Sequence, residues 1–514
     1  MPSQQTQRLI TLIKSMTRSE KRVFRLIYGR NKPAADQLYI ELFDFIDKSQ
    51  VYNEKQLLVR CPGIKKEQLS NIKTNLLEHI LEALRHLHLK ANTDMEIRQL
   101  LDYAKVYQLK GMTTSVLETL YKARSLAQRS NQDVLAYHVL DEERNTETQH
   151  ITRSSFQKAY AIREDAVKTL ETLELRDRLA NLSLMLYGLY LRNGYVRSNE
   201  EYQEMLLYFN SRIPDVDPGN MGFYEKVFYY QSHVWFNHMT QNFAAYYRYS
   251  QKWVDCFHDD EKMISIDPLL YLKGLHNTLN ALFMANKADK FLVNFERYIR
   301  FGESLTHRIP ESHQSAYRLF FYIHQLNAIF LTGDYEQGIN RISGLTEELN
   351  SSQHFWDQNR EIVFYYKVAC VYFGADDYDR TLDYLNKIIS RPVSGLRDDI
   401  HCFARILTLI CHYEMGNDLH VSHQIRAVFR FLKKMHNLQA VQRDILQFLR
   451  RTPGMNRKDM VKEFIALREK LAPYQKDPYE RRPFLYLDII SWLDSKIQGR
   501  KIREVIKEKV NYGQ

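Results

Sequence analysis

The side chains best suited to hold a metal ion form two pairs, His401-Cys402 and Cys411-His412. Imidazole and thiolate are the ligands that zinc takes in tetrahedral sites. On one helix, Cys402 and Cys411 would lie nine residues apart, about 13.5 Å along the axis and on nearly opposite sides. The two pairs therefore cannot share one ion unless the helix breaks.

His420 and His423 have a spacing that puts both on one helix face, but no carboxylate or thiolate follows at a matching position. The sequence thus predicts no metal site and no cofactor. Adjacent carboxylates stand at 259–261, 376–377 and 398–399. Neighbours on a helix point about 100° apart, and a carboxylate near a helix start is stabilised by the helix dipole, so these groups need no catalytic role.

Sequence motifs of common enzymes are missing. The chain has no GxGxxG, GxxxxGK[ST], GxSxG or HExxH, so the usual phosphate-binding loops, nucleophile elbows and zinc protease helices are not encoded. We therefore expect the protein to act by binding and not by catalysis. Its 34 tyrosines, several of them in tracts such as 246–249, favour packing between helices, with base stacking or a peptide-binding groove as the alternatives.

Charge is distributed unevenly along the chain, which has 514 residues and a net charge of +10. Residues 1–90 hold 16 Lys and Arg against 9 Asp and Glu, and residues 421–514 hold 21 against 10, whereas residues 91–420 hold 35 against 43. The pattern favours solvated basic helix faces without a dedicated ligand, and the alternatives are contact with nucleic acid, with an acidic partner or with another copy of the chain. The distribution of charge does not determine whether the protein is a monomer or an oligomer.

Five cysteines without a CxxC pair, a first segment without a signal-peptide core and the lack of a long apolar run predict a cytoplasmic protein without a membrane segment. Gly and Pro together number 30, about half of the average share. Long amphipathic stretches separate these breakers, and alternating β-branched segments are missing. The fold should be all-α.

Two stretches of the chain resemble each other. HQLNAIFLTGDYEQGINRISGL at 324–345 and YYKVACVYFGADDYDRTLDYLNKII at 365–389 share a small residue, an aromatic, a glycine turn and an aromatic that opens a second helix. Gly333, Gly374 and Gly416 of a third, weaker unit follow one another at 41 and 42 residues. This constellation resembles the tetratricopeptide repeat (TPR), most closely over residues 320–390.

The resemblance implies a TPR-like α-solenoid of helical hairpins with a period of about 41–47 residues. We expect it over residues 91–435, with a basic helical segment at 1–90 and a basic helical cap at 436–514. Such a solenoid has a concave face, and we expect it to bind a peptide or a helix of another protein. The residues predicted to face that partner are Asn327, Tyr366, Lys367 and Arg405.

An alternative follows from the first 90 residues. Segment 54–60, the turn Cys61-Pro62-Gly63-Ile64 and the helix that follows have helix-turn-helix lengths. The alternative function is a transcriptional regulator or nucleic-acid-binding protein with the solenoid as sensor. Its contacts would be Lys65, Lys66, Asn71 and Lys73, and the competing interpretation is a helical cap on the first repeat.

Overall fold

The computed structural model describes residues 3–29, 34–149, 155–305, 311–342, 358–392, 398–435, 440–451, 455–481, 484 and 487–511. Helices joined by short turns make up these residues, and no strand occurs among them, so the predicted all-α fold is confirmed. The chain forms two compact units, Met1–Leu173 and Glu174–Gln514. The three-part division at residues 90 and 435 stays a prediction.

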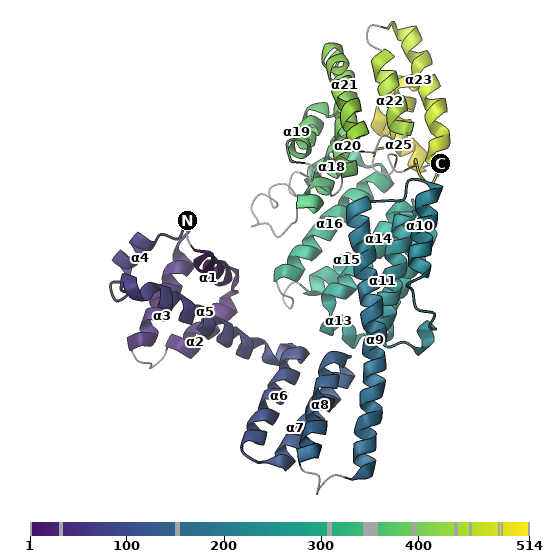
Figure 1. Cartoon of the computed structure of the whole chain (residues 1–514). Coiled ribbons are helices and arrows are strands. Elements are labelled where there is room, and N and C mark those ends of the chain that lie inside the picture. The colour runs from purple at the N-terminus through teal and green to yellow at the C-terminus, as the bar shows by residue number, and fades with distance from the viewer. Residues whose placement is uncertain are drawn as a thin grey trace. The chain divides into compact units, whose positions relative to one another are not determined.

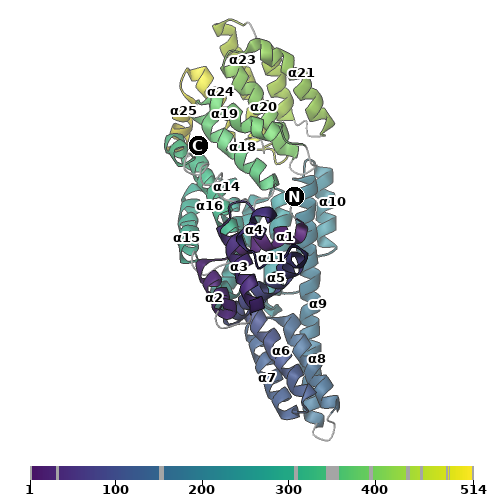
Figure 2. The same cartoon turned by 90° about the vertical axis from the view of Figure 1, so that its left-hand side faces the viewer.

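Unit 1 consists of an N-terminal cluster of helices followed by a helical bundle. The helices of the cluster are α1 (Gln4–Ser15), α2 (Arg18–Gly29), α3 (Ala34–Lys48), α4 (Glu54–Arg60) and α5 (Lys66–His88), and those of the bundle are α6 (Thr93–Leu109), α7 (Thr113–Arg129), α8 (Asp133–Gln149) and the first half of α9 (Phe156–Asn193). Figures 1 and 2 show α6, α7 and α8 side by side, and each contacts the next. The apolar cores of cluster and bundle are separate.

Unit 2 begins within α9 and continues through helical pairs. Its further helices are α10 (Asn199–Asn210), α11 (Phe223–Met239), α12 (Phe243–Asp259), α13 (Lys262–Ile266), α14 (Pro268–Met284), α15 (Ala288–Leu305), α16 (Glu311–Thr332), a helical stretch at 335–342, α18 (Gln358–Gly374), α19 (Tyr378–Ile389), α20 (Asp398–Glu414), α21 (Asp418–Lys434), α22 (Ala440–Arg451), α23 (Arg457–Leu471), α24 (Ile489–Gln498) and α25 (Ile502–Asn511). One apolar core extends from residue 322 to 506 and another from 195 to 331.

One turn geometry recurs between paired helices. A single residue in each turn has a positive φ, and these residues are Gly111, Asn131, Gln241, Asn286, Gly333, Asp376, Gly416 and Gly499. In seven of these eight turns, all except the one at Gly333, the amide after that residue bonds the carbonyl five residues earlier, as Met112 N–H does to Tyr107 O at 3.0 Å. This pattern satisfies the last carbonyls of one helix while the chain reverses into the next.

The glycine at 374 has a different role from the predicted turn. It ends α18, and the left-handed residue of that turn is Asp376. A Cβ atom at Gly374 would lie 2.5 Å from the ring of Tyr335, so glycine is needed there for close packing. Likewise, a Cβ at Gly338 would lie 2.8 Å from Ile329, so glycine allows the close approach of these two helical stretches. Residues 343–357 of the resembling stretch lie outside the described residues.

The C-terminal segment of unit 2 returns to the turns of earlier pairs. Arg481 donates to the carbonyl of Gln241 and lies over the ring of Phe243. Further on, Trp492 donates from Nε1 to Glu414 at 2.6 Å, and Arg503 pairs with Glu336. We call residues 475–481 and 487–511 the C-terminal strap, because side chains from both segments contact turns far apart in the sequence.

No helix within the described residues is long and apolar enough to cross a membrane. All five cysteines are buried as free thiols. Burial raises the pKa of Cys256 and of Cys370 to about 12, so these two sulfurs are protonated near neutral pH.

Candidate functional site

The four residues predicted to face a partner lie within or against the core of unit 2. Asn327 and Lys367 are brought together, since the Lys367 ammonium donates to the side-chain oxygen of Asn327, and their exposed fractions are 0% and 3%. Tyr366 is buried beside Phe403. Arg405 is half-buried, with its guanidinium 3.8 Å from the centroid of the Phe431 ring. These contacts stabilise the packing of helices, and their role in partner binding stays a prediction.

The predicted helix-turn-helix segment is helical over the predicted lengths. Asn53 caps α4 through bonds to the amides of Lys55 and Gln56, and α5 begins at Lys66. Lys65, Lys66 and Asn71 are exposed at the start of α5. Lys73 is instead 7% exposed and lies 3.3 Å from both Thr6 Oγ1 and Glu54 Oε2. The structure therefore leaves three of the four residues on one exposed helix start and places the fourth in the core.

Residues considered for metal binding do not converge. Within the described part of the chain, no three His, Cys, Asp or Glu side chains are grouped so that they could hold an ion. His412 and His420 do lie together, with ring centroids 4.2 Å apart. Burial and the neighbouring His420 lower the pKa of His412.

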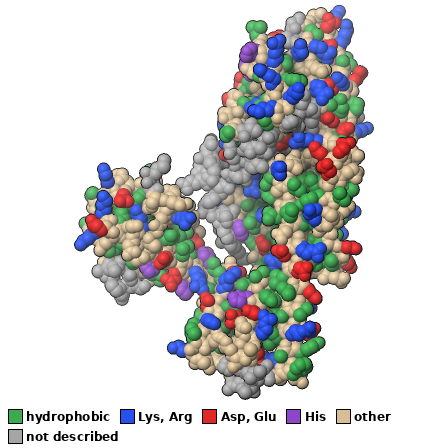
Figure 3. Space-filling model, viewed as in Figure 1, with side chains coloured by type: hydrophobic (Ala, Val, Ile, Leu, Met, Phe, Trp, Pro, Cys, Tyr) green, Lys and Arg blue, Asp and Glu red, His purple; other side chains and the backbone are tan. Residues whose placement is uncertain are grey.

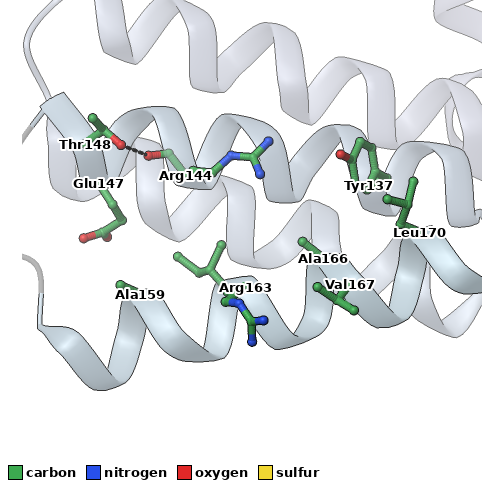
Figure 4. Close-up of a pocket in the computed structure, with 10 residues that line it drawn as sticks. Tyr137, Arg144, Glu147, Thr148, Ala159, Arg163, Ala166, Val167 and Leu170 are labelled. Carbon is green, nitrogen blue, oxygen red and sulfur yellow. Dashed lines mark hydrogen bonds between the residues drawn. The ribbon is translucent and has the colours of Figure 1, made fainter.

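A groove lies between α8 and the first half of α9 in unit 1 (Figure 4). It encloses about 480 Å³. Residues from both helices line it: Tyr137, Arg144, Glu147, Thr148, Ala159, Ile162, Arg163, Ala166, Val167 and Leu170. From α9 the lining includes the buried Ile162 and the small Ala159 and Ala166. Small side chains allow another helix to approach closely, because interaxial distance depends on the residues at the contact.

Apolar side chains continue along α9 beside this groove. Phe156, Tyr160, Val167 and Leu170 are 82%, 53%, 42% and 52% exposed. With Arg163 they follow one another at intervals of 4, 3, 4 and 3 residues, which is the spacing of a coiled-coil seam. Figure 3 shows hydrophobic side chains gathered over the first half of α9. We call this row the α9 seam.

An ionic network holds the two walls of the groove in place. Arg124 of α7 pairs with Glu143 of α8 at 3.1 Å and with Asp165 of α9. Burial raises the pKa of Glu143, and the attraction of Arg124 opposes that rise. Glu147 of α8 is also bridged to α9, by Lys158. The network thus joins α7, α8 and α9 around the groove.

The groove was missed by the sequence prediction, although the 4-3-4-3 spacing in FQKAYAIREDAVKTL is visible in the chain. The spacing alone cannot separate a seam buried in a core from one left open. Comparison of the chain with protein-family models, with curated proteins and with solved structures found no match.

Proposed function

We propose that this protein is a non-enzymatic binding scaffold of the TPR-like solenoid type, and that its α8–α9 groove captures an amphipathic helix of another protein. The observation that carries the proposal is the open α9 seam beside a groove whose lining includes the buried Ile162 and the small Ala159 and Ala166. Exposed apolar side chains at coiled-coil spacing are stabilised when a partner helix covers them.

Two features support the solenoid type. The left-handed turn residues at 241, 286, 333, 376 and 416 recur at intervals of 40–47 residues. The first helices of successive pairs, α14, α16, α18, α20 and α22, each contact the next in this order. In stacked helical hairpins, the first helix of each hairpin is expected to pack against the first helix of the next.

The size of the groove sets the length of the ligand. From Phe156 to Leu170 the α9 seam covers about 21 Å. A partner helix of about 14 to 18 residues would therefore cover it. Full burial of one Val or Leu side chain stabilises by about 1.5–3 kcal/mol, and micromolar binding needs about 8 kcal/mol net of the entropic costs of association, so the partner must make apolar contacts along the whole seam.

A helical-peptide display library tests the proposal. Peptides of 18 residues with a helix-favouring frame and a randomised apolar row are selected on the full chain. Their affinities are then measured for wild type, for a Val167→Lys/Leu170→Lys variant and for the control Leu184→Lys. Leu184 lies on the same helix, outside the groove, and is 67% exposed.

We expect selected peptides to bind wild type and the Leu184→Lys control alike and to lose at least tenfold in affinity for the double variant. Both groove positions are exposed, so the substitutions should leave the fold intact, which circular dichroism checks. Equal binding to all three proteins, or no enrichment at all, would overturn the proposal.

A second candidate function is binding of nucleic acid through the start of α5. It is favoured by the exposure of Lys65, Lys66 and Asn71 directly after the short turn that follows α4. Lysines at such a position would neutralise phosphates, and affinity would then fall steeply with salt. The solenoid would act as the sensor of such a regulator.

The test is a salt series of duplex DNA binding with wild type, Lys65→Glu/Lys66→Glu and the control Lys110→Glu. Lys110 is an exposed lysine at the end of α6. If this second function is correct, Lys65→Glu/Lys66→Glu should bind DNA more weakly than wild type, whereas Lys110→Glu should bind it as tightly as wild type. Binding that is absent, or that ignores both salt and the double variant, would rule it out.

A further inference from the structure

The groove carries two cations in an otherwise largely apolar lining. Arg144 comes from α8 and Arg163 from α9, on opposite walls. The third charged residue, Glu147, is 8% exposed and is already bridged by Lys158. A helix docked in the groove would cover both guanidiniums.

The two arginines lie at the same level of the groove. Figure 4 shows Tyr137 opposite Leu170 at one end and Thr148 opposite Ala159 at the other. Arg144 lies seven residues from Tyr137 along α8, and Arg163 lies seven residues from Leu170 along α9. Because the two helices run in opposite directions, equal offsets put both arginines on one level, about 10 Å from the Tyr137–Leu170 end.

Among the described residues, the ion-pair partner of each guanidinium is a surface carboxylate of its own helix. Arg144 pairs with Asp141 and Arg163 with Glu164, and the side chains of both pairs are 42–66% exposed. Exposed pairs of this kind stabilise by at most about 1 kcal/mol, so they compete weakly with a ligand. Covering two guanidiniums with purely apolar side chains would cost far more, because buried charges require a partner.

A second copy of α9 does not supply that partner. In a parallel pairing Arg163 would face Arg163 of the other copy. In an antiparallel pairing Glu164 and Glu171, which flank the seam on one side, would face the same carboxylates. Like charges thus oppose self-association at this surface, and the occupant must differ in charge from the α9 seam.

We infer that the groove selects a partner helix with one Asp or Glu in its apolar row, whose carboxylate binds Arg144 and Arg163 from the two walls. Large apolar residues should stand four and seven positions to one side of that carboxylate, where they would reach Val167 and the Tyr137–Leu170 end. A small residue should stand four positions to the other side, over Ala159. Guanidinium binds carboxylate through paired hydrogen bonds, which fixes the register of the helix as well as its affinity. The inference rests on the proposed function of the groove.

The experiment uses peptides selected on the full chain as above. The central Asp or Glu of each is changed to Asn or Gln, and affinities are measured for wild type, Arg144→Met/Arg163→Met and the control Arg129→Met. Arg129 is exposed at the end of α7, outside the groove. We expect the amide peptide to bind wild type at least tenfold more weakly, and the difference between the peptides to vanish with the double variant.

Two outcomes would overturn this inference and leave the proposed function standing. In the first, the selected peptides depend on Val167 and Leu170 but contain no preferred Asp or Glu. In the second, the acid and amide forms of a peptide bind with equal affinity. Failure to obtain any peptide that depends on the groove would overturn both. Because Arg144 and Arg163 are exposed, the methionine variants should fold, and their melting curves check this.

Discussion

Lys367 of α18 and Asn327 of α16 bond through their side chains inside the core of unit 2, where an ammonium group is rare. Asn327 also lies 3.3 Å from Nδ1 of His324, and Nε2 of His324 lies 2.9 Å from Nδ1 of His276 on α14. The Lys367 ammonium lies 4.7 Å from the centroid of the Phe283 ring. One polar chain therefore joins three successive first helices through an otherwise apolar core.

Replacing Asn327 should destabilise unit 2 more than replacing Lys367. Asn327→Leu leaves a buried ammonium without its amide oxygen, at a cost of about 2–3 kcal/mol. Lys367→Met removes the charge and keeps an apolar chain of similar volume, at about 1–2 kcal/mol. All four tryptophans lie beyond residue 174, so urea unfolding followed by tryptophan fluorescence reports unit 2 alone. The opposite ranking would show that the charge is satisfied by other contacts.

Unit 2 should lose stability as pH falls below about 6.5. Burial lowers the pKa of His276 to about 3, and burial with the neighbouring His276 lowers that of His324. A proton then binds the unfolded chain before the native one, so stability is full above pH 6.5 and falls by about 1.4 kcal/mol per pH unit for each such histidine. At pH 5 the loss from His276 is about 2 kcal/mol.

His276→Gln should make the free energy of unfolding fall less steeply with decreasing pH. Urea unfolding of the wild type and the variant at several pH values between 6.5 and 4 measures this difference. His86→Gln, at an exposed position on α5 of unit 1, is the control. A slope unchanged by His276→Gln would mean that His276 binds a proton as readily in the native state as in the unfolded chain.

Arg124→Met should loosen the groove. The substitution leaves Glu143 buried without its counter-ion, at a cost of about 3 kcal/mol at neutral pH. Hydrogen exchange of residues 156–173 should accelerate and selected peptides should bind more weakly. Because burial raises the pKa of Glu143, the carboxyl takes up a proton on acidification, so the defect should shrink near pH 5. Arg129→Met, on the same helix, should change neither property.

Trp492→Phe should weaken the attachment of the C-terminal strap. The indole Nε1–H donates to Glu414, whose side chain is 6% exposed and is also paired with Lys496. Losing a hydrogen bond to a buried carboxylate costs about 1.5–3 kcal/mol. We expect a lower midpoint of unfolding for unit 2 and faster hydrogen exchange in α24. An unchanged midpoint would place the stabilising contacts of the strap elsewhere.

Local patterns in the sequence predicted the helices far better than the site. The segment 54–60 and the turn at Gly333 could be predicted because caps and glycines act within a few residues. Turns at Asn131, Gln241 and Asn286 could not, since residues other than glycine adopt the left-handed conformation there.

The sequence did not predict that Lys367 is buried or that the α9 seam is exposed to solvent, and the reason is the same for both. Both depend on which helices lie alongside, and those helices are distant in the sequence: Lys367 meets Asn327 forty residues away. Hydrophobic spacing defines a face of a helix but not whether that face is covered.

The contact of Arg481 with Gln241 has a consequence for synthesis of the chain. A ribosome adds about 5–20 residues per second, so the 240 residues between them take on the order of ten to fifty seconds. During that interval the guanidinium of Arg481 cannot yet contact the carbonyl of Gln241 or the ring of Phe243 in the α11–α12 turn. Unit 2 therefore forms the contacts of its C-terminal strap only after its first helical pairs have left the ribosome. During that time the α11–α12 turn would be accessible to chaperones.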